Sequence, residues 1–319
     1  MKKPSKTTKT SGTKPFKDSV VFFGSGPVAA ESLNLLLDQF EIEAVITKPR
    51  LPHHRGDTPV VDLCVERGLA FYTPANKQEL SELFTTISLD SQIGVVIDYG
   101  IIINNDVIEF FTLGIVNSHF SLLPEWRGAD PISFSILSGQ PKTGVSLMII
   151  EPTLDTGKLI AQKSMPIDPD DTTPSLTTKL IRLSDKLLGD YLPGYISGNI
   201  TPRRQPHPNR ATYSRKLTKD DGVLDWSKPA EQLEREIRAF IDWPKSRTTL
   251  AGKDVVITQA HATPTVGADQ KPGDITVVPE TKTLGIATSS GTLWIDRLKP
   301  AGKNEMTGEA FLAGHRNQL

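Results

Sequence analysis

The first 200 residues alternate short apolar runs with amphipathic stretches of helical period. Uninterrupted apolar runs are typical of strands buried on both faces of a sheet, and helices between such strands make them parallel. The sequence therefore predicts an α/β fold, with a Rossmann-like, mostly parallel sheet and helices on both faces. The predicted strands are Ser19–Phe23, Glu43–Thr47, Gly94–Asp98, Gly114–Asn117, Thr143–Ile150 and Lys158–Pro166, and the predicted helices are Val28–Gln39, Pro59–Arg67 and Thr173–Gly198.

The pattern changes after residues 199–212, a segment rich in Pro and Arg that has no periodicity. We interpret it as an interdomain linker. One helical stretch and several short strands separated by Gly and Pro follow, which is typical of a small barrel. A C-terminal OB-like β-barrel domain fits the length and would suit a nucleic-acid partner. The predicted organisation is a disordered basic tail (1–17), an α/β domain (18–198), the linker (199–212) and the OB-like domain (213–319).

Several classes of protein are disfavoured by simple properties of the chain. No apolar run reaches the roughly 18–20 residues of a membrane helix, and the basic start has no apolar core of the kind found in secretory signals. We therefore expect a cytoplasmic protein with no membrane partner. The single cysteine, Cys64, allows neither an intrachain disulfide nor a cysteine metal cluster, and no metal site is predicted. It lies in an amphipathic helical pattern and is expected to pack as a small buried hydrophobe.

The formal net charge of −1 conceals an uneven distribution along the chain. Residues 18–199 hold 12 Lys and Arg against 23 Asp and Glu, a net charge of −11. Residues 200–319 hold 18 against 14, a net charge of +4, and residues 1–17 add six Lys and no acid. A basic C-terminal third beside an acidic body favours a polyanionic partner, although a mixed solvated surface explains a charge of +4 about as well.

A glycine-rich turn follows the first predicted strand and matches the dinucleotide fingerprint G-x-G-x-x-A, with Gly24, Gly26 and Ala29 at the fixed positions. That fingerprint also needs an acid at the end of the second strand to hold the ribose. The second strand ends in Thr47-Lys48, and Glu43 lies at its start. Since tight strand-to-helix turns need glycine in many α/β folds, the turn alone is weak evidence for an NAD-dependent dehydrogenase.

Asn117 and His119 stand where another apolar strand ends. Ligands of doubly wound sheets bind at the carboxyl ends of the strands, and residues i and i+2 of an extended segment face the same way. An amide can stabilise an oxyanion and an imidazole can shuttle a proton, so this pair is a candidate catalytic site. Taken alone, a strand cap and a buried core histidine are the simpler explanation.

Asp155 makes the catalytic interpretation stronger. The apolar run GVSLMII leads into Glu151–Gly157, so Asp155 is also expected at an edge of the sheet, where a carboxylate can orient the imidazole. A set of Asn, His and Asp without a nucleophilic Ser or Cys suits direct attack of an amine on an activated acyl group. The alternative is that Asp155 is only a turn residue of Asp-Thr-Gly.

The segment VNSHFSLLPEWRGADPI, followed by LDTG, resembles the formyltransferase family that uses 10-formyltetrahydrofolate. The resemblance implies that the catalytic residues are Asn117, His119 and Asp155. It also implies a folate cleft with walls from two segments. The candidate folate-binding residues are Asp98, Tyr99, Gly100, Ile101, Ser121, Leu122, Leu123 and Pro124.

The resemblance continues through YSRKLTKDDGVLDWSKPAEQLEREIRAFIDWP to RLKPAGKNEM, segments similar to those of family members that act on methionyl-tRNA. It implies formyl transfer to the α-amino group of initiator methionyl-tRNA, by direct amine attack, for translation initiation. We expect a monomer. The candidate tRNA contacts are Lys48, Arg50, Arg55, Arg127, Arg203, Arg204, Arg215 and Lys216.

Two departures from the family pattern concern tRNA. The loop after the second strand, TKPRLPHHRGDTP, is short, and Glu125 and Asp130 bring acids where bases or alanine are common. A nucleotide-sugar N-formyltransferase, which shares the trio of Asn117, His119 and Asp155 and can carry a similar C-terminal module, is kept as the alternative. A non-catalytic RNA-binding protein would not need Asn117, His119 and Asp155 together.

Overall fold

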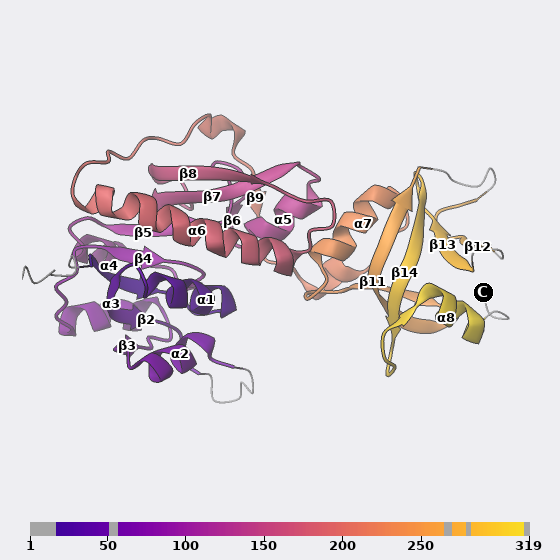
Figure 1. The fold of residues 1–319 in the computed structure, drawn as a ribbon, viewed down its shortest axis with the longest axis horizontal. Coiled ribbons are helices and arrows are strands. Elements are labelled where there is room, and N and C mark those ends of the chain that lie inside the picture. Colours follow the sequence, from indigo (N-terminus) through magenta and orange to yellow (C-terminus); the bar gives the residue numbers. More distant parts are fainter. Residues whose placement is uncertain (1–16, 51–56, 265–269, 279–281, 316–319) are drawn as a thin grey trace, which may run out of the picture. The chain divides into compact units, whose positions relative to one another are not determined.

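The computed structural model describes residues 17–50, 57–264, 270–278 and 282–315 (Figure 1). The chain forms two compact units, which divide between Ile115 and Val116. In the described residues, no helix has the length and apolar character needed to cross a lipid bilayer.

The first unit contains a parallel sheet with strand order β3-β2-β1-β4. Its strands are β1 (Ser19–Phe23), β2 (Glu41–Ile46), β3 (Phe71–Tyr72) and β4 (Gly94–Val96). Its helices are α1 (Pro27–Leu36), α2 (Pro59–Arg67), α3 (Lys77–Thr86) and α4 (Asn105–Phe110). The parallel arrangement predicted from the apolar runs is confirmed. Strand β3 and helices α3 and α4 were not predicted.

The strand order reverses direction at β1, which has β2 on one side and β4 on the other. Because crossovers between parallel strands are right-handed, such a reversal sends the connecting helices to opposite faces of the sheet. Accordingly, α1 packs with α2, and α3 packs with α4. The carboxyl ends of β1 and β4 form the topological switch point where ligands of such sheets bind. Cys64 of α2 is fully buried, as predicted, and burial raises the pKa of its thiol to about 11.

The second unit begins with three antiparallel strands in the order β5-β7-β8. They are β5 (Ile115–His119), β7 (Lys142–Ile149) and β8 (Leu159–Pro166), and helix α6 (Thr173–Ile196) packs against β7 and β8. Helix α5 (Pro131–Leu137) lies between β5 and β7 in the sequence. A short parallel pair joins β6 (Arg127–Gly128) to β9 (Tyr213–Ser214). The antiparallel direction of β7 and β8 departs from the parallel pattern that continuous apolar runs suggest.

The rest of the second unit is a small antiparallel β domain, shown in orange and yellow in Figure 1. Its strand order is β10-β11-β14-β13-β12, and β15 pairs with β14. The strands are β10 (Ser246–Leu250), β11 (Lys253–Thr263), β12 (Ile275–Val278), β13 (Thr283–Ala287), β14 (Thr292–Pro300) and β15 (Met306–Thr307). The helices are α7 (Ala230–Ala239) and α8 (Gly308–His315), with short 3₁₀ turns at Pro208–Arg210 and Lys219–Gly222.

The core of this domain lies between α7, α8 and the sheet, and includes Leu233, Ile257, Leu298 and Phe311. The predicted fold class, a mostly parallel α/β sheet followed by a small C-terminal β domain, is confirmed. No pairing between β10 and β12 occurs among the described residues, so closure of this sheet into a barrel stays a prediction. The predicted limits of the linker also stay a prediction.

An acid-sensitive contact stabilises the start of the C-terminal domain. Asp221 accepts hydrogen bonds from the guanidinium of Arg215 and from the backbone N–H and hydroxyl of Thr218, at 2.7–2.9 Å for the Arg215 Nη1 and Thr218 contacts. The Arg215 guanidinium holds the pKa of Asp221 well below its usual range. A depressed carboxyl pKa stabilises the folded state above the unfolded pKa of about 3.9, and that stability is lost as pH falls further.

Asp221→Asn is therefore expected to lower the Tm by several degrees at pH 7. The difference from the wild type should shrink as the pH is reduced from 5 towards 3. Thermal unfolding across this pH range measures it, and a Tm difference that is independent of pH would contradict the role given to the charge.

Candidate active site

Strand β5 carries Asn117 and His119 on one face. The intervening Ser118 points to the opposite face, where its hydroxyl lies 2.6 Å from that of Ser184 on α6. Because successive side chains of a strand alternate between its faces, Asn117 and His119 project together, away from α6. The Asn117 side chain is half-buried, and its amide makes no hydrogen bond within the described part of the chain. Its N–H groups are therefore available to a bound molecule.

The imidazole of His119 is buried between a carbonyl and a carboxylate. Its Nε2 lies 2.9 Å from the carbonyl oxygen of Trp126, which can only accept, so Nε2 carries a proton. Its Nδ1 lies 4.0 Å from Oδ2 of Asp155, beyond hydrogen-bonding distance. A proton taken up at Nδ1 would produce an imidazolium next to this carboxylate. The ring is thus arranged to accept a proton on the side that faces Asp155.

Asp155 reaches His119 by a route that the sequence pattern did not indicate. Since β7 runs antiparallel to β5, its carboxyl end meets the start of β5, with Ile149 opposite Val116. The loop after β7 turns back, and Asp155 arrives beside His119 from there. Oδ2 of Asp155 accepts a hydrogen bond from the backbone N–H of Gly128 at 2.7 Å. The predicted trio is therefore gathered in one place, although its catalytic role stays a prediction.

Gly128 is needed for this contact. Its φ is +113°, and a Cβ atom there would lie 2.2 Å from the carbonyl oxygen of Ser214. Any larger residue would move the backbone N–H that Asp155 holds. The sequence shows this glycine in a loop, but its neighbour Ser214 is 86 residues further along and was not predictable.

The two segments predicted to bind folate belong to different units. Ser121–Pro124 is fixed to β7 and β8: the Ser146 hydroxyl donates to the Ser121 carbonyl oxygen at 2.6 Å, and the Gln162 amide donates to that of Leu123 at 2.9 Å. Residues 98–101 follow β4 at the topological switch point. Within the first unit, a pocket of about 420 Å³ opens there, with Ser25, Lys48, Gly100 and Ile101 among its lining residues.

Glu43 and the glycine turn do not form a ribose site. Both carboxylate oxygens of Glu43 accept backbone N–H groups, from Asp90 at 2.7 Å and Ser91 at 2.8 Å. A Cβ atom on Gly26 would lie 2.3 Å from the carboxylate of Asp98, so close packing alone explains this glycine. The dehydrogenase interpretation therefore loses its remaining support.

The two acids that depart from the family pattern have partners within the loop region. Glu125 accepts a hydrogen bond from the Gln140 amide at 3.1 Å. Asp130 caps α5 by accepting the backbone N–H of Ser133 at 3.3 Å, and burial raises the pKa of its carboxyl. Both acids thus serve the local structure.

The candidate tRNA contacts are distributed over several environments. Arg203, Arg204 and Lys216 are exposed, and Arg215 is exposed but paired with Asp221. Lys48 is half-buried. Exposed Arg50 donates to the Thr58 hydroxyl at 3.1 Å. Arg127 is buried, with 6% of its surface exposed, and the structure does not bring it to the surface. Arg55 lies outside the described residues. The tRNA role of all eight stays a prediction.

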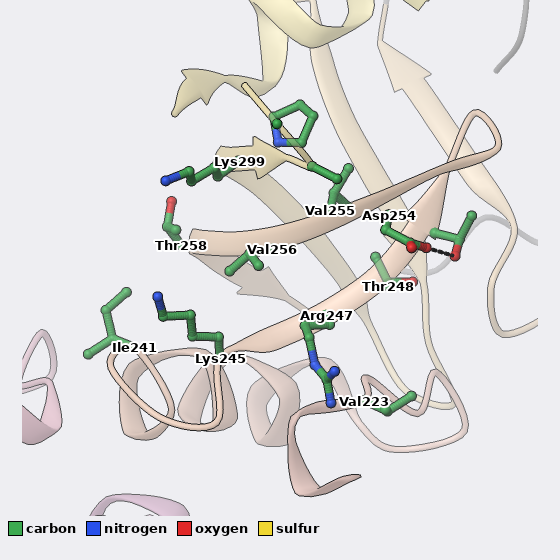
Figure 2. Close-up of a pocket in the computed structure, with 14 residues that line it drawn as sticks. Val223, Ile241, Lys245, Arg247, Thr248, Asp254, Val255, Val256, Thr258 and Lys299 are labelled. Carbon is green, nitrogen blue, oxygen red and sulfur yellow. Dashed lines mark hydrogen bonds between the residues drawn. The ribbon is translucent and has the colours of Figure 1, made fainter. Parts of the chain in front are cut away.

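A groove on the C-terminal domain adds cations that the sequence did not single out. It has a volume of about 500 Å³ and is lined by residues of β10, β11 and the end of β14. Figure 2 shows the side chains of Lys245, Arg247 and Lys299 around it. Arg247 donates to the carbonyl oxygen of Lys219, whereas Lys245 and Lys299 are exposed and have no ion pair with any described residue. Asp254 is the acid in the lining.

Comparison with known proteins assigns the chain to a class. Residues 19–192 match the family model "Formyl transferase", and residues 216–316 match "Formyl transferase, C-terminal domain". The chain therefore belongs to the formyl transferase family and is an enzyme of that family with both of its domains.

Within this family, the chain is similar over nearly its whole length to curated methionyl-tRNA formyltransferases. A methionyl-tRNA formyltransferase from Roseiflexus castenholzii is 36% identical over 303 residues, which cover 93% of this chain and 96% of the relative. One from Myxococcus xanthus is 38% identical over 301 residues, covering 93% and 95%. Among solved structures, an N-formyltransferase from Helicobacter canadensis in complex with folinic acid and dTDP-3-aminofucose has a TM-score of 0.65 at 20% identity, covering 88% of this chain and 98% of that one. At this identity the likeness concerns the fold.

Proposed function

We propose that this protein transfers the formyl group of 10-formyltetrahydrofolate to the α-amino group of initiator methionyl-tRNA, for translation initiation. The observation that carries the proposal is the nearly full-length similarity, across both domains, to curated methionyl-tRNA formyltransferases. Such a protein would act in the cytoplasm as a monomer. The alternative acceptor, an amino-sugar nucleotide, has support only from distant structural neighbours.

The reaction needs a nucleophile, an oxyanion donor and a path for protons. The substrate amine attacks the formyl carbon, a C–N bond forms, and the carbonyl oxygen becomes an oxyanion that the Asn117 amide stabilises. His119 takes the proton that the amine loses, at Nδ1 beside Asp155. The tetrahedral intermediate then collapses, the bond between the formyl carbon and N10 of the folate breaks, and N10 receives the proton that His119 took up, which returns the imidazole to its neutral form. No covalent intermediate with the protein is required.

The direct test is formyl transfer with purified protein and 10-formyltetrahydrofolate. Charged initiator methionyl-tRNA and an amino-sugar nucleotide are offered separately as acceptors. We expect formyl-methionyl-tRNA and no turnover of the sugar. Formylation of the sugar with an inactive tRNA arm would overturn the proposal and favour the alternative.

The proposal also assigns tRNA affinity to the C-terminal domain. Lysines that neutralise phosphates release counterions, so affinity falls with salt in proportion to the number of contacts. Lys245→Ala and Lys299→Ala should each raise the KM for tRNA several-fold, reduce the slope of log affinity against log salt by about 1, and leave the KM for folate unchanged.

The control is Lys186→Ala, which removes an exposed lysine of α6 that does not line the groove. Binding of charged tRNA is measured between 50 and 200 mM salt, the range over which such contacts change affinity strongly. Groove variants with the same salt slope as Lys186→Ala would show that tRNA binds elsewhere.

A further inference from the structure

Thr212 at the end of the segment interpreted as a linker, and Ser214 just after it, make hydrogen bonds with the loop that follows His119. The backbone N–H of Trp126 donates to the Thr212 hydroxyl at 2.9 Å, and that of Arg127 donates to the Thr212 carbonyl oxygen at 2.9 Å. The backbone N–H of Asp130 donates to the Ser214 hydroxyl at 3.1 Å. The loop that supplies the carbonyl partner of His119 is therefore held by residues more than 80 positions away.

Gln205, in the middle of the segment 199–212, contacts the loop that carries Asp155. Its side chain is buried, with 7% of its surface exposed. Its Nε2 donates to the carbonyl oxygens of Asp155 at 2.7 Å and Gly157 at 3.0 Å. Its Oε1 accepts a hydrogen bond from Nη2 of buried Arg127 at 2.7 Å. Both amide hydrogens and the amide oxygen thus connect the loop of Asp155 to the loop of His119.

The loop that Gln205 holds has an unfavourable backbone. Asp155 has a φ of +51°, in the left-handed region that most residues with a side chain avoid and that aspartate enters at a smaller cost. A Cβ atom on Gly157 would lie 1.7 Å from the carbonyl oxygen of Ile149, so the backbone packs closely there as well. Gln205 binds the carbonyl groups on both sides of Thr156. Its amide therefore stabilises the conformation that directs the Asp155 carboxylate towards His119.

We propose that Gln205 is a positioning residue that fixes Asp155 relative to His119 for formyl transfer. It touches no reacting atom: it acts through the backbone of residues 155–157 and through Arg127. The inference rests on the proposed function, since its effect is read in the same reaction. It also assigns a role to a segment whose sequence has no periodicity.

The test begins with two substitutions of Gln205. Gln205→Ala removes both sets of contacts and should lower kcat about 10- to 100-fold, because a displacement of about 1 Å in catalytic groups has effects of this size. The KM values for folate and tRNA should stay within about twofold, since no substrate contact is lost. Gln205→Glu keeps the size and an acceptor for Arg127 but places oxygen against the carbonyl groups of Asp155 and Gly157. It should be impaired as severely as Gln205→Ala.

Asn199→Ala is the matched control. It truncates an exposed amide at the start of the same segment, whose side chain donates to Ser197 at 3.0 Å. Its kcat, KM and Tm should equal those of the wild type. Wild-type activity in Gln205→Glu would overturn the proposal, because filling space and holding Arg127 would then be sufficient.

A double-mutant cycle separates positioning from general destabilisation. In an Asp155→Asn background, Gln205→Ala should reduce kcat little further, because the carboxylate that it positions is already absent. An equal fold-loss in both backgrounds would overturn the proposal. Hydrogen exchange supplies a readout that does not depend on activity: the Gly128 amide, which donates to Asp155, should exchange faster in Gln205→Ala. A wild-type protein that is inactive on charged tRNA would contradict the proposed function, while unchanged exchange at Gly128 would contradict this inference alone.

Discussion

Replacing His119 by Asn should lower kcat about 10²- to 10⁴-fold, the contribution typical of a well-placed acid–base group. The loss should appear in kcat, with the KM for folate and tRNA nearly constant. Asp155→Asn should also be severe. An asparagine at position 155 can still accept the Gly128 N–H through its amide oxygen, so this substitution removes the charge and largely keeps the loop.

The double variant of His119 and Asp155 tests whether the two side chains act as one unit. Asp155 is placed to stabilise the proton on Nδ1 of His119, at 4.0 Å, so it has little to contribute once the imidazole is absent. The combined loss should be far smaller than the product of the two single losses. Single-turnover measurement of all four proteins decides this. Fully multiplicative losses would show that Asp155 acts only as a turn residue.

The second large effect is expected for the oxyanion donor. Asn117→Ala should reduce kcat about 10²- to 10³-fold, as is typical when one such donor is removed. Because the amide is half-buried and makes no hydrogen bond in the described part of the chain, its loss should leave the Tm nearly unchanged.

Ser118→Ala is a control on the same strand, since its hydroxyl faces Ser184 of α6 instead. It should retain kcat, with any cost confined to stability. Activity of Asn117→Ala within about twofold of the wild type would remove Asn117 from the mechanism.

A large part of the fold could be predicted because buried strands and helices have characteristic patterns of apolar and polar residues. The continuous apolar runs of β1 and β4 indicated strands covered on both faces, and the change to short strands separated by Gly and Pro after residue 200 indicated a second type of domain. The direction of a strand is harder to predict from the sequence. The run of β7 is as apolar as a parallel strand because α6 covers it, and its antiparallel direction could not be read from composition.

The three candidate catalytic residues could be predicted from the sequence, but the way in which the chain brings Asp155 to the other two could not. Asn117 and His119 share a face because of the two-residue repeat of a strand, which is local. The position of Asp155 depends on a loop that turns back towards β5. The contact of Gln205 with that loop joins segments about 50 residues apart in the sequence. A buried glutamine within a segment rich in Pro and Arg has the sequence context of an exposed one. Only tertiary contacts distinguish the two.

The parallel pairing of β6 with β9 has a consequence for protein engineering. The sequence pattern alone would place the junction of a chimera with a relative's C-terminal domain in the segment without periodicity, here 199–212. Such a junction would combine the loop of His119 from one parent with Gln205, Thr212 or Ser214 from the other. Recombination should instead be made after Ser214, so that the strand pair and its catalytic loop are inherited together. The unit of exchange in this chain is thus longer than the sequence-defined domain 18–198 by the 16 residues 199–214.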